Sequence, residues 1–192
     1  MANNVPIVPA KSWLDIAASA RSIINDVKPG LLKAPDAFPL IDFIEFRLRD
    51  VLNFNFYVED LPYGVEAQTD PDNRIIVFSP ATYEALFKDD GRARFTAAHE
   101  IGHAKEHAGY LQSIISHGHK VQKYNRGDIK PYFDPEAQAN VFAASLLMPS
   151  EALWLLKKQC DGKNMIMIEE MMRIFKVSKS AASNRWKNLL KY

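Results

Sequence analysis

The stretch RFTAAHEIGHAKEH, residues 94–107, constrains the fold of this chain more than any other segment. Asp89 and Asp90 precede it, and acids near a helix start suit the helix dipole, so the pattern predicts a helix from about 92 to 107. On a helix, His99 and His103 lie on one face about 6 Å apart. Two imidazoles at that spacing are close enough to share one metal ion.

Glu100 lies one position round the same helix, beside His99. A carboxylate at that offset can reach a water on the metal without binding the metal, and can then act as a general base. The alternative interpretation is that the two histidines are polar residues on an ordinary helix. A third ligand separates the two interpretations, because catalytic zinc sites usually have three protein ligands and one open position.

The third ligand must come from elsewhere in the chain. Position 109, six residues beyond His103, is Gly, which excludes the spacing of a metzincin. The helix that begins at Pro135 offers Glu136, and Asn140 lies one turn further on the same face, where its amide could hold the free ring nitrogen of a ligating histidine. The alternative is that Glu136 is a first-turn acid that favours the helix dipole.

Three more histidines occur close to this pattern. His107 would lie about 12 Å along the helix axis from His99, too far to share its ion. We expect it to be a helix-end histidine that faces the C-terminal dipole. We expect His117 and His119 in a loop, where a solvated role is favoured over a ligand role, although one of them could enter the cleft. Gly102 is interpreted as a packing residue that lets another element approach closely.

The composition excludes several classes of protein. The 192 residues are 47% hydrophobic, which predicts one main core, and the net charge of +1 gives no general attraction to nucleic acid or to an anionic membrane. The single cysteine, Cys160, cannot form an intramolecular disulfide, which suits a reducing cytoplasm. No apolar run approaches the ~20 residues of a membrane span, so we expect a cytoplasmic protein without membrane contact.

Apolar periodicity predicts a mixed α and β chain. Turn formers in DPDN, residues 70–73, predict an antiparallel hairpin between the second and third of three strands. Gly109 is interpreted as the stop of the long helix, and residues 110–134 are predicted to form a long loop or lid. The expected helices cover residues 12–27, 41–52, 79–87, 92–107 and 135–148, and the expected strands lie within 53–61, 64–70 and 74–79.

Two quoted motifs carry a resemblance to a known family. TAAHEIGHAKEH, residues 96–107, followed by EAQANVFAASLLMP, residues 136–149, resembles the ImmA/IrrE zinc metallopeptidases, with their H-E-x-x-H and E-x-x-A-N-x-F-A-x-x-L-L-M-P motifs. The resemblance covers roughly residues 40–156. It implies an α+β, zincin-like metallopeptidase core with a small three-stranded sheet packed on the H-E-x-x-H helix, plus C-terminal helices like a helix-turn-helix.

The resemblance also implies a site and a substrate. His99, His103 and Glu136 would bind Zn²⁺, and Glu100 would be the catalytic base. Members of the family resemble site-specific proteases that cut helix-turn-helix repressors of mobile elements or stress responses. Gln138 departs from the family pattern, in which an acid is frequent, and this bears on the local electrostatics more than on metal binding.

An oxyanion donor and a substrate-binding edge are also expected. Spacing does not identify the donor: Tyr124 and His119 are candidates, as are His117 and Tyr132, and a structural role is favoured for each. An exposed edge of the strand in RIIVFS, residues 74–79, could bind substrate as an added strand.

The chain is expected to have three segments: an N-terminal helical extension at 1–39, the metallopeptidase core at 40–156, and a helix-turn-helix-like segment at 157–192. The last segment carries nine basic against three acidic side chains, which DNA phosphates could use through Arg185 and Lys187. Packing or substrate docking is favoured over DNA binding.

The resulting prediction is a zinc-dependent endopeptidase that cuts a regulatory protein, a helix-turn-helix repressor. Two alternatives belong to other classes. One is a DNA-binding regulator that uses the zinc fold as a scaffold, and the other is a toxin-antitoxin type interaction protein that binds without cutting.

Overall fold

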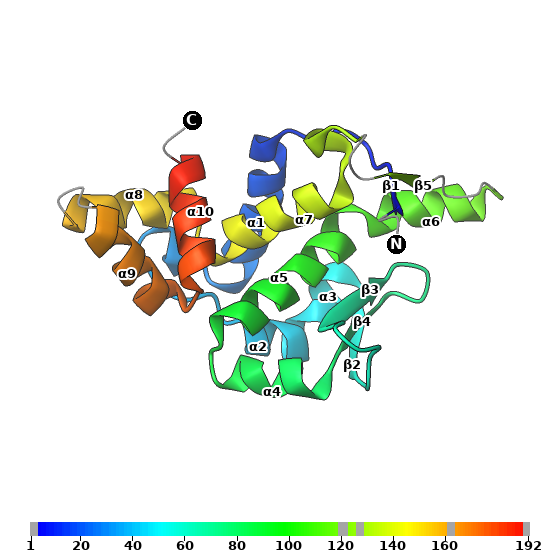
Figure 1. Ribbon diagram of the computed structural model, residues 1–192, viewed down its shortest axis with the longest axis horizontal. Coiled ribbons are helices and arrows are strands. Elements are labelled where there is room, and N and C mark those ends of the chain that lie inside the picture. Colours follow the sequence, from blue (N-terminus) through cyan, green and yellow to red (C-terminus); the bar gives the residue numbers. More distant parts are fainter. Residues whose placement is uncertain (1–3, 119–122, 126–128, 161–163, 190–192) are drawn as a thin grey trace.

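The computed structural model describes residues 4–118, 123–125, 129–160 and 164–189. Figure 1 shows helices α5 (Gly91–Glu106) and α7 (Pro135–Leu147) at the centre, a small sheet on one side and the C-terminal helices on the other. The fold is α+β, as predicted. The remaining helices are α1 (Trp13–Val27), α2 (Leu40–Asp42), α3 (Leu48–Leu52), α4 (Pro80–Phe87), α6 (Ala108–Ser116), α8 (Ser150–Gln159), α9 (Asn164–Phe175) and α10 (Lys179–Leu189), with 3-10 turns η1 (Pro29–Leu32) and η4 (Pro131–Phe133).

Helices α1, α4, α5 and α7 each begin at a residue whose side chain accepts a backbone N–H. Ser12 forms a capping box with Asp15 before α1, and the hydroxyl of Ser79 accepts from Thr82 N before α4. Asp90 and Asp134 cap α5 and α7 in the same way. These caps satisfy donors that a helix start leaves unpaired, which explains why the predicted helix starts agree with the structure.

The second predicted helix is not regular. Residues 40–52 form α2, then a π-helical segment η2 (Phe43–Arg47), then α3. Phe43, Ile44 and Leu48 are buried in the core, so the apolar face of the predicted helix does point inward. Apolar periodicity alone does not distinguish a regular α-helix from one that is interrupted by a π-helical turn.

The three-stranded sheet contains β2 (Asn55–Val58), β4 (Ile75–Phe78) and β3 (Ala67–Asp70), in that order. β3 and β4 are antiparallel, with Asp70 opposite Ile75, which confirms the predicted hairpin. β2 is parallel to β4, with Asn55 opposite Ile75. The carboxylate of Asp70 accepts backbone N–H groups of Asp72 and Asn73, which holds the turn.

The position of β4 corrects one prediction. The strand in RIIVFS lies in the middle of the sheet and is paired on both sides, so it offers no free edge for a substrate. Ile76 and Phe78 are fully buried there, and such dense branched apolar sequence is typical of a central strand. The edge next to α5 belongs to β3, which packs directly against α5.

The predicted loop at 110–134 is also wrong. Residues Ala108–Ser116 form α6, Lys123–Asn125 form β5, and η4 precedes α7. Gly109 is not the predicted helix stop, because α5 ends at Glu106 with His107 as its C-cap and Gly109 lies in α6. Gly118, which adopts a left-handed φ of 73°, lies just beyond the end of α6.

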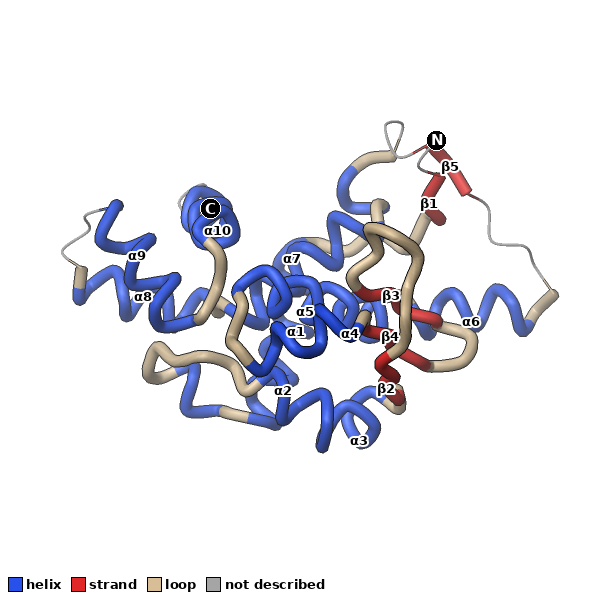
Figure 2. Tube along the Cα trace, turned by 60° about the horizontal axis from the view of Figure 1, so that its bottom comes forward, coloured by secondary structure: helices blue, strands red, loops and turns tan. Residues whose placement is uncertain are grey.

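The N-terminal segment is joined to this same region. β1 (Asn4–Pro6) pairs antiparallel with β5, and Figure 2 shows this pair set apart from the three-stranded sheet. Val8 N and Lys11 N then donate to the carbonyls of Phe133 and Tyr132. α1 packs along α7, and its buried Ile16 belongs to the same core cluster as the central helices.

The C-terminal helices pack on the start of α5 and the end of α7. Gly91 lies so close to the backbone of Val177 and Ser178, in the turn between α9 and α10, that a Cβ there would overlap both. The guanidinium of Arg185 donates to the carbonyl of Met148 and to the hydroxyl of Ser150. The hydroxyl of Ser178 accepts from Ala181 N at the start of α10.

Across the residues that the structure describes, no single helix is long and apolar enough to cross a membrane. α7 and α8 pass such a test only as a pair, and that pair is bent by 51°.

Candidate metal centre

The site lies where α5 and α7 pack against each other at close range. Gly102 makes this approach possible, since a Cβ at that position would lie 3.2 Å from both Cα and O of Ala139 and 3.2 Å from a ring carbon of Phe142. The packing role predicted for Gly102 is therefore correct. The close approach brings the histidines of α5 and the first turn of α7 together.

Three side chains meet at one point. His99 Nε2 lies 3.3 Å from Glu136 Oε2, His103 Nε2 lies 3.3 Å from Glu136 Oε1, and the two Nε2 atoms are 3.0 Å apart. Their ligand atoms all lie within 4.8 Å of one another. The side chains are partly buried, with 16%, 18% and 32% of their surface exposed for His99, His103 and Glu136. One face of the cluster is thus open.

This geometry fits a tetrahedral metal ion. Ligand atoms bound tetrahedrally at about 2.0–2.1 Å stand about 3.3 Å from one another. The two histidine nitrogens are 3.0 Å apart, and each lies 3.3 Å from a different oxygen of Glu136, which is close to that value. Two imidazoles and one carboxylate are a donor set typical of catalytic zinc, and three protein ligands leave one position open.

The electrostatics of the cluster favour a cation at its centre. Hydrogen bonds from His103 and His99 hold the pKa of the Glu136 carboxyl far below its usual range, although burial opposes this. Burial lowers the pKa of His99, but contacts with Glu136, Glu100 and Asn140 outweigh it and raise the pKa above its usual value. The negative charge of Glu136 thus holds a proton tightly on the neighbouring histidines, and a metal cation at the same place would balance that negative charge.

Glu100 is buried beside the cluster, with 8% of its surface exposed. Its Oε2 accepts a hydrogen bond of 2.7 Å from the hydroxyl of Thr69 on β3, and that hydroxyl also lies 3.0 Å from the Glu100 carbonyl. No sequence motif points to Thr69. Its only sequence signal is its place in an extended segment, because the contact spans 31 positions and depends on β3 forming the edge next to α5.

Asn140 contacts His99 on the side away from the cluster. Its Oδ1 is 3.0 Å from Nδ1 of His99, the ring nitrogen that does not face the cluster. An amide oxygen can only accept, so Nδ1 of His99 donates to it and Nε2 is the nitrogen that faces Glu136.

His107 differs from its prediction. It is almost fully buried, with Nδ1 3.1 Å from Nδ1 of His103 and Nε2 3.1 Å from Oε1 of Gln138. Burial, and then the neighbouring His103, lower the pKa of His107 to about 3. A neutral imidazole gains little from the helix dipole, so the favoured dipole role is wrong. The reason is that α6 and the N-terminal segment cover this end of α5.

The candidate oxyanion donors stay unassigned. His119 lies outside the described residues, and of Tyr124 the structure describes the backbone, which pairs with Val5 between β5 and β1. His117 is exposed, and its Nδ1 lies 2.6 Å from the carbonyl of Ser113 at the end of α6. Tyr132 contributes its carbonyl to Gln138 Nε2 and Lys11 N, which is a structural contact.

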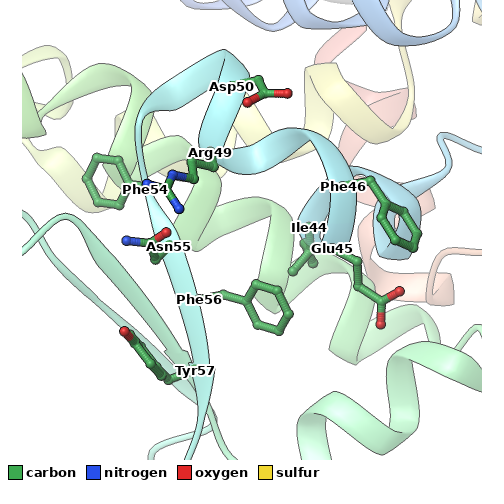
Figure 3. A pocket seen from close by; sticks show the side chains of 9 residues that line it. All are labelled: Ile44, Glu45, Phe46, Arg49, Asp50, Phe54, Asn55, Phe56 and Tyr57. Atoms are coloured by element: carbon green, nitrogen blue, oxygen red, sulfur yellow. The ribbon is translucent and has the colours of Figure 1, made fainter.

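A separate pocket of about 340 Å³ lies on the far edge of the sheet. Figure 3 shows that side chains from η2, α3 and β2 line it, including Phe46, Phe56 and Tyr57. None of the residues that line it belongs to the histidine cluster. The pocket therefore takes no part in the candidate metal centre.

Comparisons with known proteins agree with this geometry. The model of the Peptidase M78 family, described as the IrrE N-terminal-like domain, matches residues 85–187, just over half of the chain. No curated protein shows significant sequence similarity. Ten chains of solved structures match. One is a "Mycobacterium tuberculosis transcriptional regulator", with a TM-score of 0.58 and 16% identity over 88% of this chain and 45% of that one. This chain thus spans under half the length of that neighbour, and the likeness is one of fold.

Proposed function

Because this chain belongs to the IrrE N-terminal-like family of Peptidase M78, we propose that it is a zinc-dependent endopeptidase. The observation that carries the proposal is the meeting of His99, His103 and Glu136 at tetrahedral spacing, with Glu100 buried beside them. A metallopeptidase-like domain is shown by the family match. Zinc, catalysis and the roles of the individual residues are what we propose.

Zinc would be held by Nε2 of His99, Nε2 of His103 and the carboxylate of Glu136. When bound, zinc supplies a Lewis acid that polarises the scissile carbonyl and lowers the pKa of the attacking water. Zinc is the default metal for this donor set, although manganese or iron can load in vitro.

Glu100 carries the proton in this proposal. Its carboxylate takes a proton from the water as the water oxygen bonds to the carbonyl carbon. It then delivers that proton to the leaving amine nitrogen as the C–N bond breaks. Thr69 holds Oε2 of Glu100, so we assign the proton transfer to Oε1. Asn140 holds the ring of His99 with its lone pair toward the cluster.

The substrate would bind along β3. This strand is an edge of the sheet, packs on α5, and carries Thr69 against the proposed base. An extended peptide that pairs with an edge strand forms backbone hydrogen bonds with it, and here such a peptide would lie across the proposed metal site. We propose a regulatory protein, a helix-turn-helix repressor, as the substrate. The family resemblance supports this, as does the name of the transcriptional regulator that shares the fold.

The C-terminal segment is proposed to pack rather than to bind DNA. Arg185 donates to Met148 O and Ser150 Oγ, and burial lowers its pKa to about 10. Its guanidinium is therefore committed to the end of α7 and is not free for a phosphate. We keep 40–156 as the proposed catalytic segment, with 1–39 and 157–192 packed on it as the extension and the helix-turn-helix-like segment.

The first test is metal content. Elemental analysis of the purified protein after dialysis and zinc resupply should give about one zinc per chain in the wild type and in Glu100→Gln, and none in Glu136→Ala. A wild type without stoichiometric zinc contradicts the proposal. A peptide library derived from bacterial proteins, read by mass spectrometry, should show new cleavage products with the wild type and none with Glu100→Gln. Equal products from both proteins would remove Glu100 as the base.

A further inference from the structure

A chain of buried hydrogen bonds runs from the candidate metal centre to the N-terminal segment. Its members are His103, His107 and Gln138, and it ends on the carbonyls of Pro9 and Tyr132. His107 and Gln138 are almost completely buried. Buried polar groups form definite donor and acceptor pairs, so the direction of every bond in this chain can be worked out.

The direction is set at the far end, by Gln138. Its Nε2 lies 3.0 Å from the carbonyl oxygen of Pro9 and 2.8 Å from that of Tyr132. Carbonyl oxygens only accept, so both contacts require the NH₂ group of the amide, and the flipped orientation would set oxygen against oxygen. Oε1 of Gln138 therefore faces His107, and His107 must donate from Nε2.

The next bond follows from the proposed zinc site. A histidine that binds zinc through Nε2 keeps its ring proton on Nδ1, so His103 donates from Nδ1 to Nδ1 of His107, 3.1 Å away. His107 must then accept on Nδ1 and donate from Nε2, which is the direction that Gln138 sets independently from the other end.

We propose that His107 and Gln138 are positioning residues that fix His103 in the tautomer able to bind a metal. The inference rests on the proposed zinc site. It assigns this role through a neutral histidine and an amide, where metal-bound histidines commonly use a carboxylate or a backbone carbonyl. His99 reaches the same state by a shorter route, through Asn140.

The tautomers can be measured directly. Long-range ¹H–¹⁵N correlation spectra of the zinc-loaded wild type should show His99 and His103 protonated on Nδ1, and His107 protonated on Nε2. A His107 protonated on Nδ1 overturns the inference.

A pair of variants at His107 separates polarity from packing. In His107→Gln, the amide oxygen can accept from His103 and the NH₂ group can donate to Gln138, so zinc affinity in chelator competition should stay near that of the wild type. In His107→Leu the acceptor is lost, and affinity should fall about 10- to 100-fold. An equal loss in both variants, or no loss in either, contradicts the assigned role.

Gln138 offers a second test, which serves if His107→Leu does not fold. Gln138→Met removes the acceptor that faces Nε2 of His107. Zinc affinity in chelator competition should fall, and His107 should no longer be held with its proton on Nε2. Wild-type zinc affinity and a wild-type His107 tautomer in Gln138→Met contradict the inference.

Failure of the inference is distinguishable from failure of the proposed function. Zinc bound at one per chain with His107 protonated on Nδ1 would leave the proposed peptidase intact and overturn the tautomer chain. No zinc uptake by the wild type would instead overturn the proposed function.

Discussion

Gly102 offers a direct test of how α5 and α7 position the site. In Gly102→Ala the new Cβ would lie 3.2 Å from Cα and O of Ala139, against about 3.5–4.0 Å for an ordinary contact between carbon atoms. Ala139 lies in the middle of α7, so its backbone cannot yield alone. The two helices must separate by a few tenths of an ångström, or the ring of Phe142 and the backbone must adjust together.

The size of the effect follows from two opposing contributions. Alanine in a helix interior is favoured over glycine by about 1 kcal/mol, whereas overpacking a core costs about 1–3 kcal/mol. Gly109, in α6, has open space where an added methyl group would lie, with no neighbouring atom within 4 Å. Gly109→Ala should therefore gain helix propensity without any destabilisation from overpacking. We expect Gly102→Ala to be less stable than Gly109→Ala by about 1–3 kcal/mol.

The assay is urea unfolding of the zinc-free variants, followed by chelator competition for zinc. Since α7 carries Glu136, Gly102→Ala should also bind zinc more weakly than the wild type, and Gly109→Ala should bind it equally well. If Gly102→Ala were as stable as Gly109→Ala and kept full zinc affinity, the close approach of α5 and α7 would not position the site.

Two further predictions concern β3 and its turn. Thr69→Val removes a hydrogen bond to a charged group, which is worth about 1.5–3 kcal/mol. The kcat on a cleaved library peptide should therefore fall about 10- to 100-fold with zinc content unchanged, and Thr69→Ser should restore kcat. A wild-type kcat in Thr69→Val would contradict the proposed role of Thr69. Hydrogen bonds from the Asn73 side chain, then from backbone amides, lower the pKa of Asp70. That stabilisation is present above the unfolded pKa of about 3.9 and is lost as pH falls through the folded value, so the stability difference between wild type and Asp70→Asn should shrink below about pH 4. A difference that acid leaves unchanged would refute this.

The pairing of the two histidines could be predicted because its geometry is local, whereas Glu136 was assigned through the family resemblance. A separation of four residues on one helix fixes the relative position of His99 and His103 without any knowledge of the fold. Asn140 follows Glu136 by the same spacing on α7. Helix starts are equally local, since Ser12, Ser79 and Asp134 each bond to a backbone group two or three residues further on.

The errors arise where tertiary packing decides the outcome. His107 ends α5, which suggests a charged histidine beside the dipole, but α6 begins directly after it and buries it. The stretch RIIVFS is expected at an edge, although its run of branched residues is typical of a strand paired on both sides. Thr69 has no local signal, because its role depends on which strand lies next to α5.

The groups that hold the site extend beyond the part of the chain that carries the family match. The proposed ligands and the proposed base lie within residues 85–187, but Thr69, Pro9 and Lys11 do not. Thr69 contacts the carboxylate of Glu100, and Pro9 fixes the amide of Gln138 at the end of the chain of bonds that reaches His103. A sequence motif therefore carries the proposed ligand atoms, whereas the groups that hold them come from one strand and from the segment before α1. If the proposed zinc site is right, we expect changes in the first eleven residues to weaken zinc binding even where every motif residue is kept.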